Sequence, residues 1–91
     1  MIRSCRDKET ERIFTLCPSR KFQSIQERAE NVLALLDAAT DLGDLSGSGL
    51  RLEKLAGDRQ GQYSIRINRQ YRVCFEWHDG NAYQAEIVDY H

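Results

Sequence analysis

The sequence predicts an α+β fold in which two N-terminal helices pack on a mostly antiparallel sheet. Apolar residues recur at helical spacing in the first half of the chain, and apolar and polar residues alternate strictly in the second half. Short turns containing glycine, aspartate or asparagine separate the alternating runs, as in an antiparallel meander. With 91 residues and no proline- or glycine-rich linker, the chain is expected to form one domain over residues 1–91.

The first half of the chain is expected to hold a short edge strand at residues 2–5 and two helices. Residues 7–16 are acidic near their start, which suits a helix dipole, and Pro18 ends this first helix. Ser24 and Glu27 fit a capping box that would begin the second helix. Its apolar stripe, which we expect to pack on the sheet, consists of Ile25, Ala29, Val32, Leu36 and Ala39, widened by Leu33 and Leu35.

The second half of the chain changes to a period of two after the flexible residues 46–49. Each alternating run is bounded by turn residues, and the Asp79-Gly80 pair is a hairpin signal. The predicted strands are residues 50–55, residues 62–68, residues 71–78 and a last run from about 82 toward 90.

The alternation also predicts which side chains share a face of the sheet. The aromatic and branched residues of these strands must meet the helices, so Arg66 and Arg72 project from the other face of adjacent strands. Ser64 and Cys74 lie between them and are small, which is expected to leave room for a ligand.

The charge of the chain is unevenly distributed. It has 13 Lys+Arg and 14 Asp+Glu, a net of -1, which by itself argues against a nucleic-acid binder. Residues 51–72, however, hold six bases and two acids, and residues 73–91 hold four acids with no Lys or Arg. Arginine matches phosphate bidentately, so the basic segment is a candidate phosphate site. On charge alone the favoured interpretation is a solvated face that pairs with the acidic segment, since structural ion pairs are common.

Several classes of protein are not expected. The chain has no run of 18 apolar residues and begins without an apolar signal-peptide core, so neither a membrane partner nor secretion is predicted. Three scattered cysteines are typical of free thiols in a reducing cytoplasm. The two histidines lack partners at ligand spacing, so neither a metal nor a cofactor is expected.

The last three residues are the main candidates for acid–base chemistry. Asp89 and His91 are two apart, so on a strand they share a face and the carboxylate could orient the imidazole. Tyr90 could stack on a base. Together with arginines on the sheet, these groups suit RNA cleavage without a metal, in which the 2′-hydroxyl attacks and cations stabilise the phosphorane.

Four runs of the sequence resemble the HigB branch of the RelE-type toxins. They are residues 51–59, 61–68, 70–75 and 86–91, and residues 36–40 add to the resemblance, which covers nearly the whole chain. The resemblance implies a RelE-like fold with a curved sheet and a cytoplasmic bacterial toxin that cleaves mRNA on the translating ribosome. It also implies a helix-turn-helix antitoxin as partner, with operator DNA bound only through the toxin–antitoxin complex.

The resemblance also implies roles for individual residues. Asp89, Tyr90 and His91 match the terminal catalytic set of the family. Arg72 matches an arginine expected to contact the scissile phosphate, and Arg59 matches the basic position after the Gly-Asp turn.

Two positions depart from the family pattern. Some members carry a histidine where this chain has Glu53 and a lysine where it has Ala56. Either Glu53 acts as the base with His91 as the acid, or Lys54 and Arg66 compensate electrostatically, or the activity is weak. Glu53 could instead form a surface salt bridge with a basic neighbour. The departures leave a second hypothesis, a non-catalytic member that binds an antitoxin or RNA, and a third, a module whose arginines are only structural.

Overall fold

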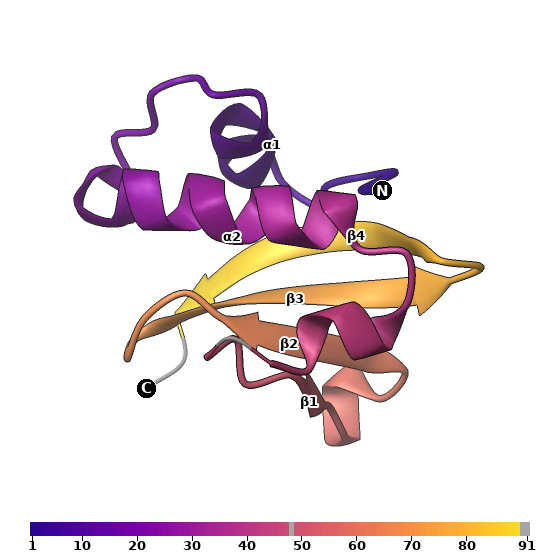
Figure 1. The fold of residues 1–91 in the computed structure, drawn as a ribbon. Helices are drawn as coiled ribbons and strands as arrows, with labels where there is room; N and C mark the ends of the chain where they lie inside the picture. The colour runs from indigo at the N-terminus through magenta and orange to yellow at the C-terminus, as the bar shows by residue number, and fades with distance from the viewer. Residues whose placement is uncertain (48, 90–91) are drawn as a thin grey trace.

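Both α-helices lie on the same side of a four-stranded sheet (Figure 1). The computed structural model describes residues 1–47 and 49–89, so the predictions for Tyr90 and His91 lie outside the described residues. The strands follow one another in the order β1-β2-β3-β4, and every neighbouring pair is antiparallel. The elements are α1 (Lys8–Phe14), α2 (Gln26–Ala38), β1 (Glu53–Lys54), β2 (Gln62–Arg66), β3 (Tyr71–His78) and β4 (Asn81–Asp89). The predicted α+β class is therefore confirmed.

The N-terminal segment covers the outer edge of β4. Single parallel bridges join Ile2 to Ala82 and Cys5 to Ala85, and the chain then turns into α1. The predicted edge segment is thus confirmed as a pair of bridges, and it satisfies backbone groups that an edge strand would otherwise expose. Over residues 1–47 and 49–89, no helix is both long enough and apolar enough to span a membrane.

Helix α2 presents its apolar stripe to the sheet, as predicted. The five residues at helical spacing are all buried, and so is Leu33. Leu35 does not belong to this stripe, because it is 50% exposed and the prediction that it widens the buried face is wrong. Each helical residue is turned by about 100° from the one before it, so Leu35 points away while its neighbour Leu36 points inward.

The predicted capping box at Ser24 and Glu27 is wrong. Ser24 lies inside a 3-10 turn over Gln23–Ile25, and α2 begins only at Gln26, with no side-chain hydrogen bond at its cap. A serine in a helical turn cannot take the extended backbone that a cap residue needs. A capping box is found instead at Asp41 and Asp44, where Asp41 is the cap of the short 3-10 turn over Leu42–Leu45 and Asp44 is the third residue of that turn.

The strand predicted at residues 50–55 is shorter than expected, and β1 contains only Glu53–Lys54. Arg51 has a φ of 51°, and this left-handed backbone interrupts the extended run. Leu50 still accepts a hydrogen bond from the Arg66 amide at 2.6 Å, so the segment remains attached to β2. The predicted strand 62–68 ends at Arg66, and the other two strands are confirmed within one residue.

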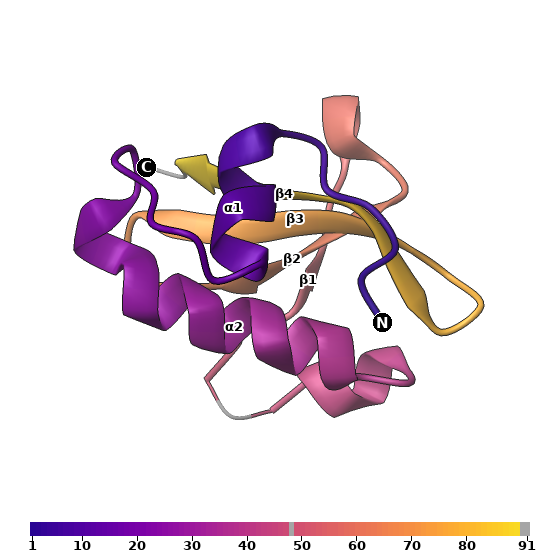
Figure 2. The ribbon, with the colours of Figure 1, turned by 90° about the horizontal axis from the view of Figure 1, so that it is seen from above.

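The core lies between α1, α2 and the sheet face that they cover, which Figure 2 shows from above. Ile65, Val73 and Phe75 are fully buried on that face, as the alternation predicts. Phe75 packs in an aromatic row, with ring-centroid distances of 6.1 Å to Tyr63 and 6.2 Å to Trp77. The opposite face of the same strands therefore carries the polar side chains.

We expect the substitution Gly80→Ala to destabilise the protein more than Gly57→Ala does. Asp79 and Gly80 have φ values of 52° and 78°, the backbone of a type I′ hairpin, which confirms the predicted turn. Both glycines are left-handed, which costs an alanine about 1–2 kcal/mol. Only at Gly80 would a Cβ also meet the Thr40 carbonyl oxygen, at 2.9 Å.

This contact should add about 1–3 kcal/mol to the loss of unfolding free energy in Gly80→Ala, because the backbone of Thr40 or of the hairpin must move to relieve it. Thermal unfolding of the two variants is the measurement. Equal losses of Tm in the two variants would show that the clash with Thr40 is relieved without cost.

Candidate functional site

The sheet face turned away from the α-helices carries a row of polar and small residues across all four strands. The register pairs Glu53 with Ser64, Ser64 with Cys74, and Cys74 with Glu86. Residues that pair across antiparallel strands point to the same side of the sheet. We call this side the polar face, and the row defines its centre.

Arg72 lies over this row and is tied down by several hydrogen bonds. Its Nε donates to the Ser64 Oγ at 2.8 Å, and its Nη2 donates to the carbonyl oxygens of Ser64 and Arg51. Its remaining nitrogen, Nη1, is 3.7 Å from the Glu53 Oε1. Arg72 is only 8% exposed, so its guanidinium is a cation of fixed position in a partly desolvated site.

The space expected above the two small residues of the row is filled. Ser64 and Cys74 are both buried, and Arg72 covers Ser64. The prediction that small side chains leave room for a ligand is therefore wrong: both residues are buried, and at Ser64 the arginine from the next pair of positions folds back over the side chain.

Glu53 pairs with Arg72, and not with a basic neighbour of its own strand. The strand register puts Glu53 on the polar face, opposite Ser64, where Arg72 reaches it. The same register puts Lys54 opposite Tyr63, whose ring packs on Phe75. Lys54 therefore points to the helix side of the sheet edge, and the structure does not bring it together with Glu53.

Arg66 is placed beside Arg72, as the alternation predicts. The two residues are Cα partners in the β2–β3 ladder. Arg66 is half-buried and its Nε donates to the Asn68 carbonyl at 3.2 Å, so it is held toward the β2–β3 turn. Two guanidinium groups thus leave neighbouring strands at the same end of the polar face.

The basic and acidic segments of the chain meet at Glu86. Arg59, from the 3-10 turn over Gly57–Arg59, places its Nη1 3.2 Å from the Glu86 Oε1 and 3.1 Å from the Gln62 Oε1. The Nε of Arg6 is 4.0 Å from the same carboxylate oxygen. Arg59 is therefore on the polar face, where a carboxylate and an amide already hold it.

Asp89 ends β4, and its register with Tyr71, whose ring packs on Phe22, turns it toward the helix side of the sheet. It is the Cα partner of Tyr71, and its Oδ2 accepts a hydrogen bond from the Gln70 Nε2 at 3.1 Å. Val88, the residue before it, is the partner of Arg72. The structure thus brings the end of β4 next to Arg72, while Arg66 lies one strand further away.

The three thiols of the chain differ in burial, and we expect them to differ in reactivity. Burial raises the pKa of the Cys5 thiol to about 11, and Glu11 and Asp7 add to this effect. Burial also raises the pKa of Cys74, with Glu86 raising it further and Arg59 and Arg72 opposing the rise. Cys17 is exposed.

At pH 8 an alkylating reagent should therefore modify Cys17 first, and Cys5 and Cys74 at least about tenfold more slowly, because the thiolate is the reactive form. The rate at Cys5 should rise about tenfold per pH unit until the pH approaches its pKa. Peptide mapping by mass spectrometry measures each rate, and Cys17→Ser should remove the fast phase. Equal rates at Cys5 and Cys17 at pH 8 would contradict this expectation.

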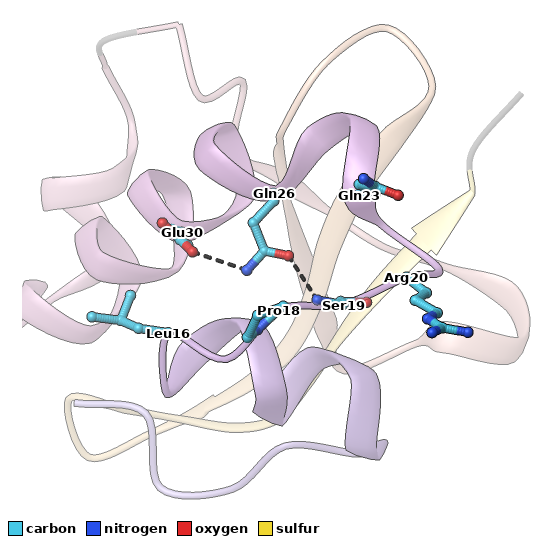
Figure 3. Close-up of a pocket in the computed structure, with 7 residues that line it drawn as sticks. All are labelled: Leu16, Pro18, Ser19, Arg20, Gln23, Gln26 and Glu30. Atoms are coloured by element: carbon cyan, nitrogen blue, oxygen red, sulfur yellow. Dashed lines mark hydrogen bonds between the residues drawn. The ribbon is translucent and has the colours of Figure 1, made fainter.

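A separate pocket lies on the helix side of the molecule. It has a volume of about 380 Å³ and lies between the loop after α1 and the start of α2 (Figure 3). Gln26 crosses it, accepting from the Ser19 amide and donating to the Glu30 carboxylate. None of the predicted site residues lines this pocket. Among the residues that the structure describes, no group of three or more His, Cys, Asp or Glu could hold a metal ion.

Sequence reasoning missed three residues of the polar face and its edge. Glu86 and Gln62 hold Arg59, and Gln70 holds Asp89. The alternation of β2 places Gln62 on the face of Ser64, which is a signal that the sequence contains. The partnership of Glu86 with Arg59 has no such signal, because it depends on a turn that folds back over the sheet.

The fold and this face define a class of protein: a small α+β domain whose sheet face opposite the helices carries ordered arginines, one of them beside the end of its last strand. Within this class, the chain belongs to the HigB-like toxin family, described as the RelE-like toxin of the type II toxin–antitoxin system HigB, whose family model matches residues 3–91.

Two relatives support this membership. The chain is 35% identical over 65 residues to a protein named Endoribonuclease HigB from Proteus vulgaris, covering 71% of each chain. It is 45% identical over 60 residues to Toxin HigB-1 from Vibrio cholerae, covering 65% of this chain and 63% of that protein.

Solved structures show the same fold at low sequence identity. Two structures of the YoeB-YefM complex from Staphylococcus aureus, one of them a heterotetrameric toxin–antitoxin complex, match with TM-scores of 0.57 and 0.61. Each is 18% identical and covers 100% of this chain and 98% of the other. At this identity the likeness concerns the fold alone.

Proposed function

We propose that this chain is a toxin endoribonuclease that cleaves mRNA on the ribosome, with attack by the 2′-hydroxyl and without a metal. The observation that carries the proposal is the placement of Arg72, a fixed guanidinium on the polar face that lies beside the end of β4. Membership in the HigB-like family and the name of the Proteus relative support the activity. Arginine can stabilise a phosphorane dianion with no help from a metal.

The proposed reaction needs a base, a cation at the phosphate and an acid. A base removes the 2′-hydroxyl proton, Arg72 neutralises the charge that develops on the phosphorane, and an acid protonates the leaving 5′-oxygen. The contact of 3.7 Å between Glu53 and Arg72 favours Glu53 as the base, with His91 as the acid, since base and cation then converge on one phosphate. Electrostatic compensation by Lys54 and Arg66 is less favoured, because Lys54 points to the other side of the sheet.

The remaining predicted groups would bind and orient the RNA. Arg66 and Arg59 flank Arg72 on the polar face and would contact neighbouring phosphates. Asp89, whose register partner Tyr71 faces the helices, would orient His91 from the sheet edge, and Tyr90 would stack on a base that is splayed from the message. Because carboxylates neutralise part of this face, we propose that the ribosome presents the message and supplies most of the affinity.

The proposed setting is the bacterial cytoplasm, where a helix-turn-helix antitoxin would neutralise the toxin. Membership in a type II toxin–antitoxin family supports an antitoxin partner. Operator DNA would be bound through the antitoxin and not by this chain alone. A short helix-turn-helix reading frame beside the gene would support this part of the proposal.

The test of the proposal is induction in growing cells of the wild type, His91→Ala and the control His78→Ala. The chain has two histidines, and His78 lies at the opposite end of β3 from the partner of Asp89, where it contacts Glu76. We expect growth arrest with new mRNA 5′ ends from the wild type and His78→Ala. His91→Ala should lower cleavage by about 10²–10⁴-fold, the usual contribution of a general acid or base.

Three outcomes would count against parts of the proposal. Growth arrest without new mRNA ends would favour the non-catalytic alternative, in which the polar face only binds RNA or an antitoxin. Full toxicity of His91→Ala would remove His91 from the mechanism. Rapid cleavage of naked RNA by the purified protein, strongly reduced by salt, would contradict ribosome dependence.

A further inference from the structure

The outer edge of β4 changes its hydrogen-bonding partner along its length. Near its start, the amides of Ala82 and Ala85 donate to carbonyl groups of residues 1–4, at 2.9 and 3.0 Å. The chain then turns into α1 and leaves this edge. The amide of Ile87, further along, donates instead to the Thr10 Oγ1 of α1 at 3.0 Å, in a buried contact.

Thr10 is an unusual residue for its position. It is fully buried, on the side of α1 that also buries Ile13. A buried hydroxyl is costly unless it is hydrogen-bonded, and an aliphatic residue would fill the same space. The bond to the Ile87 amide joins residues 77 positions apart, which gives the hydroxyl a function that packing alone does not require.

The bond lies close to the predicted catalytic end of the chain. Ile87 precedes Asp89 by two residues, and the β3 partner of Val88 between them is Arg72. The end of β4 is also held from the side of β3, where Gln70, the residue before that strand, donates to the Asp89 carboxylate at 3.1 Å. Gln70 itself belongs to a turn in which the Asn68 Oδ1 accepts the amides of residues 70 and 71, each at 2.8 Å.

We propose that Thr10 is a positioning residue, which holds the backbone of Ile87 so that the last residues of β4 stay in register with Arg72. This inference rests on the proposed function, because it assigns Thr10 a role in that cleavage. Without the hydroxyl, the Ile87 amide loses its partner and the end of β4 separates from α1. The terminal groups then lose their alignment with the scissile phosphate, and a misplacement of about 1 Å can lower a rate about 10²-fold.

The test compares three variants in a reconstituted translation reaction with a defined message. Thr10→Val removes the hydroxyl at nearly constant volume, and Thr10→Ser keeps it. Thr15→Val is the matched control, since it removes an exposed hydroxyl at the end of the same helix, where Thr15 donates to the Glu11 carbonyl. Rates are expressed per folded molecule, with the folded fraction taken from thermal unfolding of each variant.

We expect Thr10→Val to lower kcat by about 10–100-fold while KM stays within about twofold, because alignment is lost and binding is not. Thr10→Ser should recover most of kcat, and Thr15→Val should match the wild type. A purely structural Thr10 would reduce the folded fraction and leave kcat per folded molecule unchanged, and that result would overturn the proposal.

A second measurement does not depend on cleavage. Amide hydrogen exchange followed by NMR should be about tenfold or more faster at Ile87 in Thr10→Val than in Thr15→Val, with shifted resonances for residues 88–91. If the wild type cleaves no message, the proposed function fails, while these data still decide whether Thr10 positions the chain end. Unchanged exchange at Ile87, or unchanged resonances beyond it, would overturn the positioning role.

Discussion

Replacing Arg72 by alanine is expected to lower mRNA cleavage by at least about 10²-fold and also to weaken the fold. The loss of rate follows because a positioned cation on the transition-state charge contributes about this much. The loss of stability follows because Ser64 and Glu53 lose the guanidinium that contacts them. Leaving such groups without their partner costs about 1–3 kcal/mol.

Two further variants separate these effects. Arg72→Lys keeps the positive charge but cannot donate to Ser64 and to the Arg51 carbonyl with one planar fork, so we expect most of the cleavage to be lost from a folded protein. Arg3→Ala removes an exposed arginine of the N-terminal segment and should leave both properties unchanged. Thermal unfolding and mapped mRNA ends are the measurements. Full cleavage per folded molecule in Arg72→Ala would remove this residue from the site.

Replacing Phe75 by alanine is expected to lower the free energy of unfolding by about 3–5 kcal/mol, the usual cost of deleting a buried phenylalanine. Phe75 is fully buried at the centre of β3, and its ring packs on those of Tyr63 and Trp77. For a domain of this size each kcal/mol corresponds to about 4–8 °C of Tm. The variant should therefore unfold at least about 12 °C below the wild type.

Two controls belong to this experiment. Phe75→Leu retains much of the buried volume and should cost less than the alanine variant. Leu35→Ala removes a large apolar side chain that is half exposed on the outer side of α2, so it should shift Tm little. A similar loss of Tm in Leu35→Ala and Phe75→Ala would show that burial in this structure does not govern the stability.

The fold of this chain could be predicted from local pattern, whereas several boundaries could not. A period of 3.6 followed by a period of two is sufficient to predict helices and then a meander, since each element must bury one face. The start of α2 and the length of β1 were predicted wrongly. Ser24 lies in a 3-10 turn and Arg51 has a left-handed backbone, and neither conformation is marked by these residue types.

Part of the candidate site could likewise be predicted from local pattern, and part could not. Alternation was enough to place Arg66 beside Arg72 and to separate both from the core, because side chains on a strand point to opposite faces in turn. It could not predict that Arg72 folds back over Ser64, because that depends on hydrogen bonds to the Ser64 hydroxyl and to the Arg51 carbonyl, which residue spacing does not specify.

By itself, the sequence determined the α+β class, the buried stripe of α2, the shared face of the arginines and the family to which the chain belongs. Only the tertiary structure decided which polar groups meet: the ion pairs of Glu53 with Arg72 and Glu86 with Arg59, and the hydrogen bond from Gln70 to Asp89. Periodicity involves residues that are close together along the chain, so it can be recognised in the sequence without the structure. A charge pair between distant segments depends on how the sheet and its turns fold over one another, and the sequence contains no local signal for it.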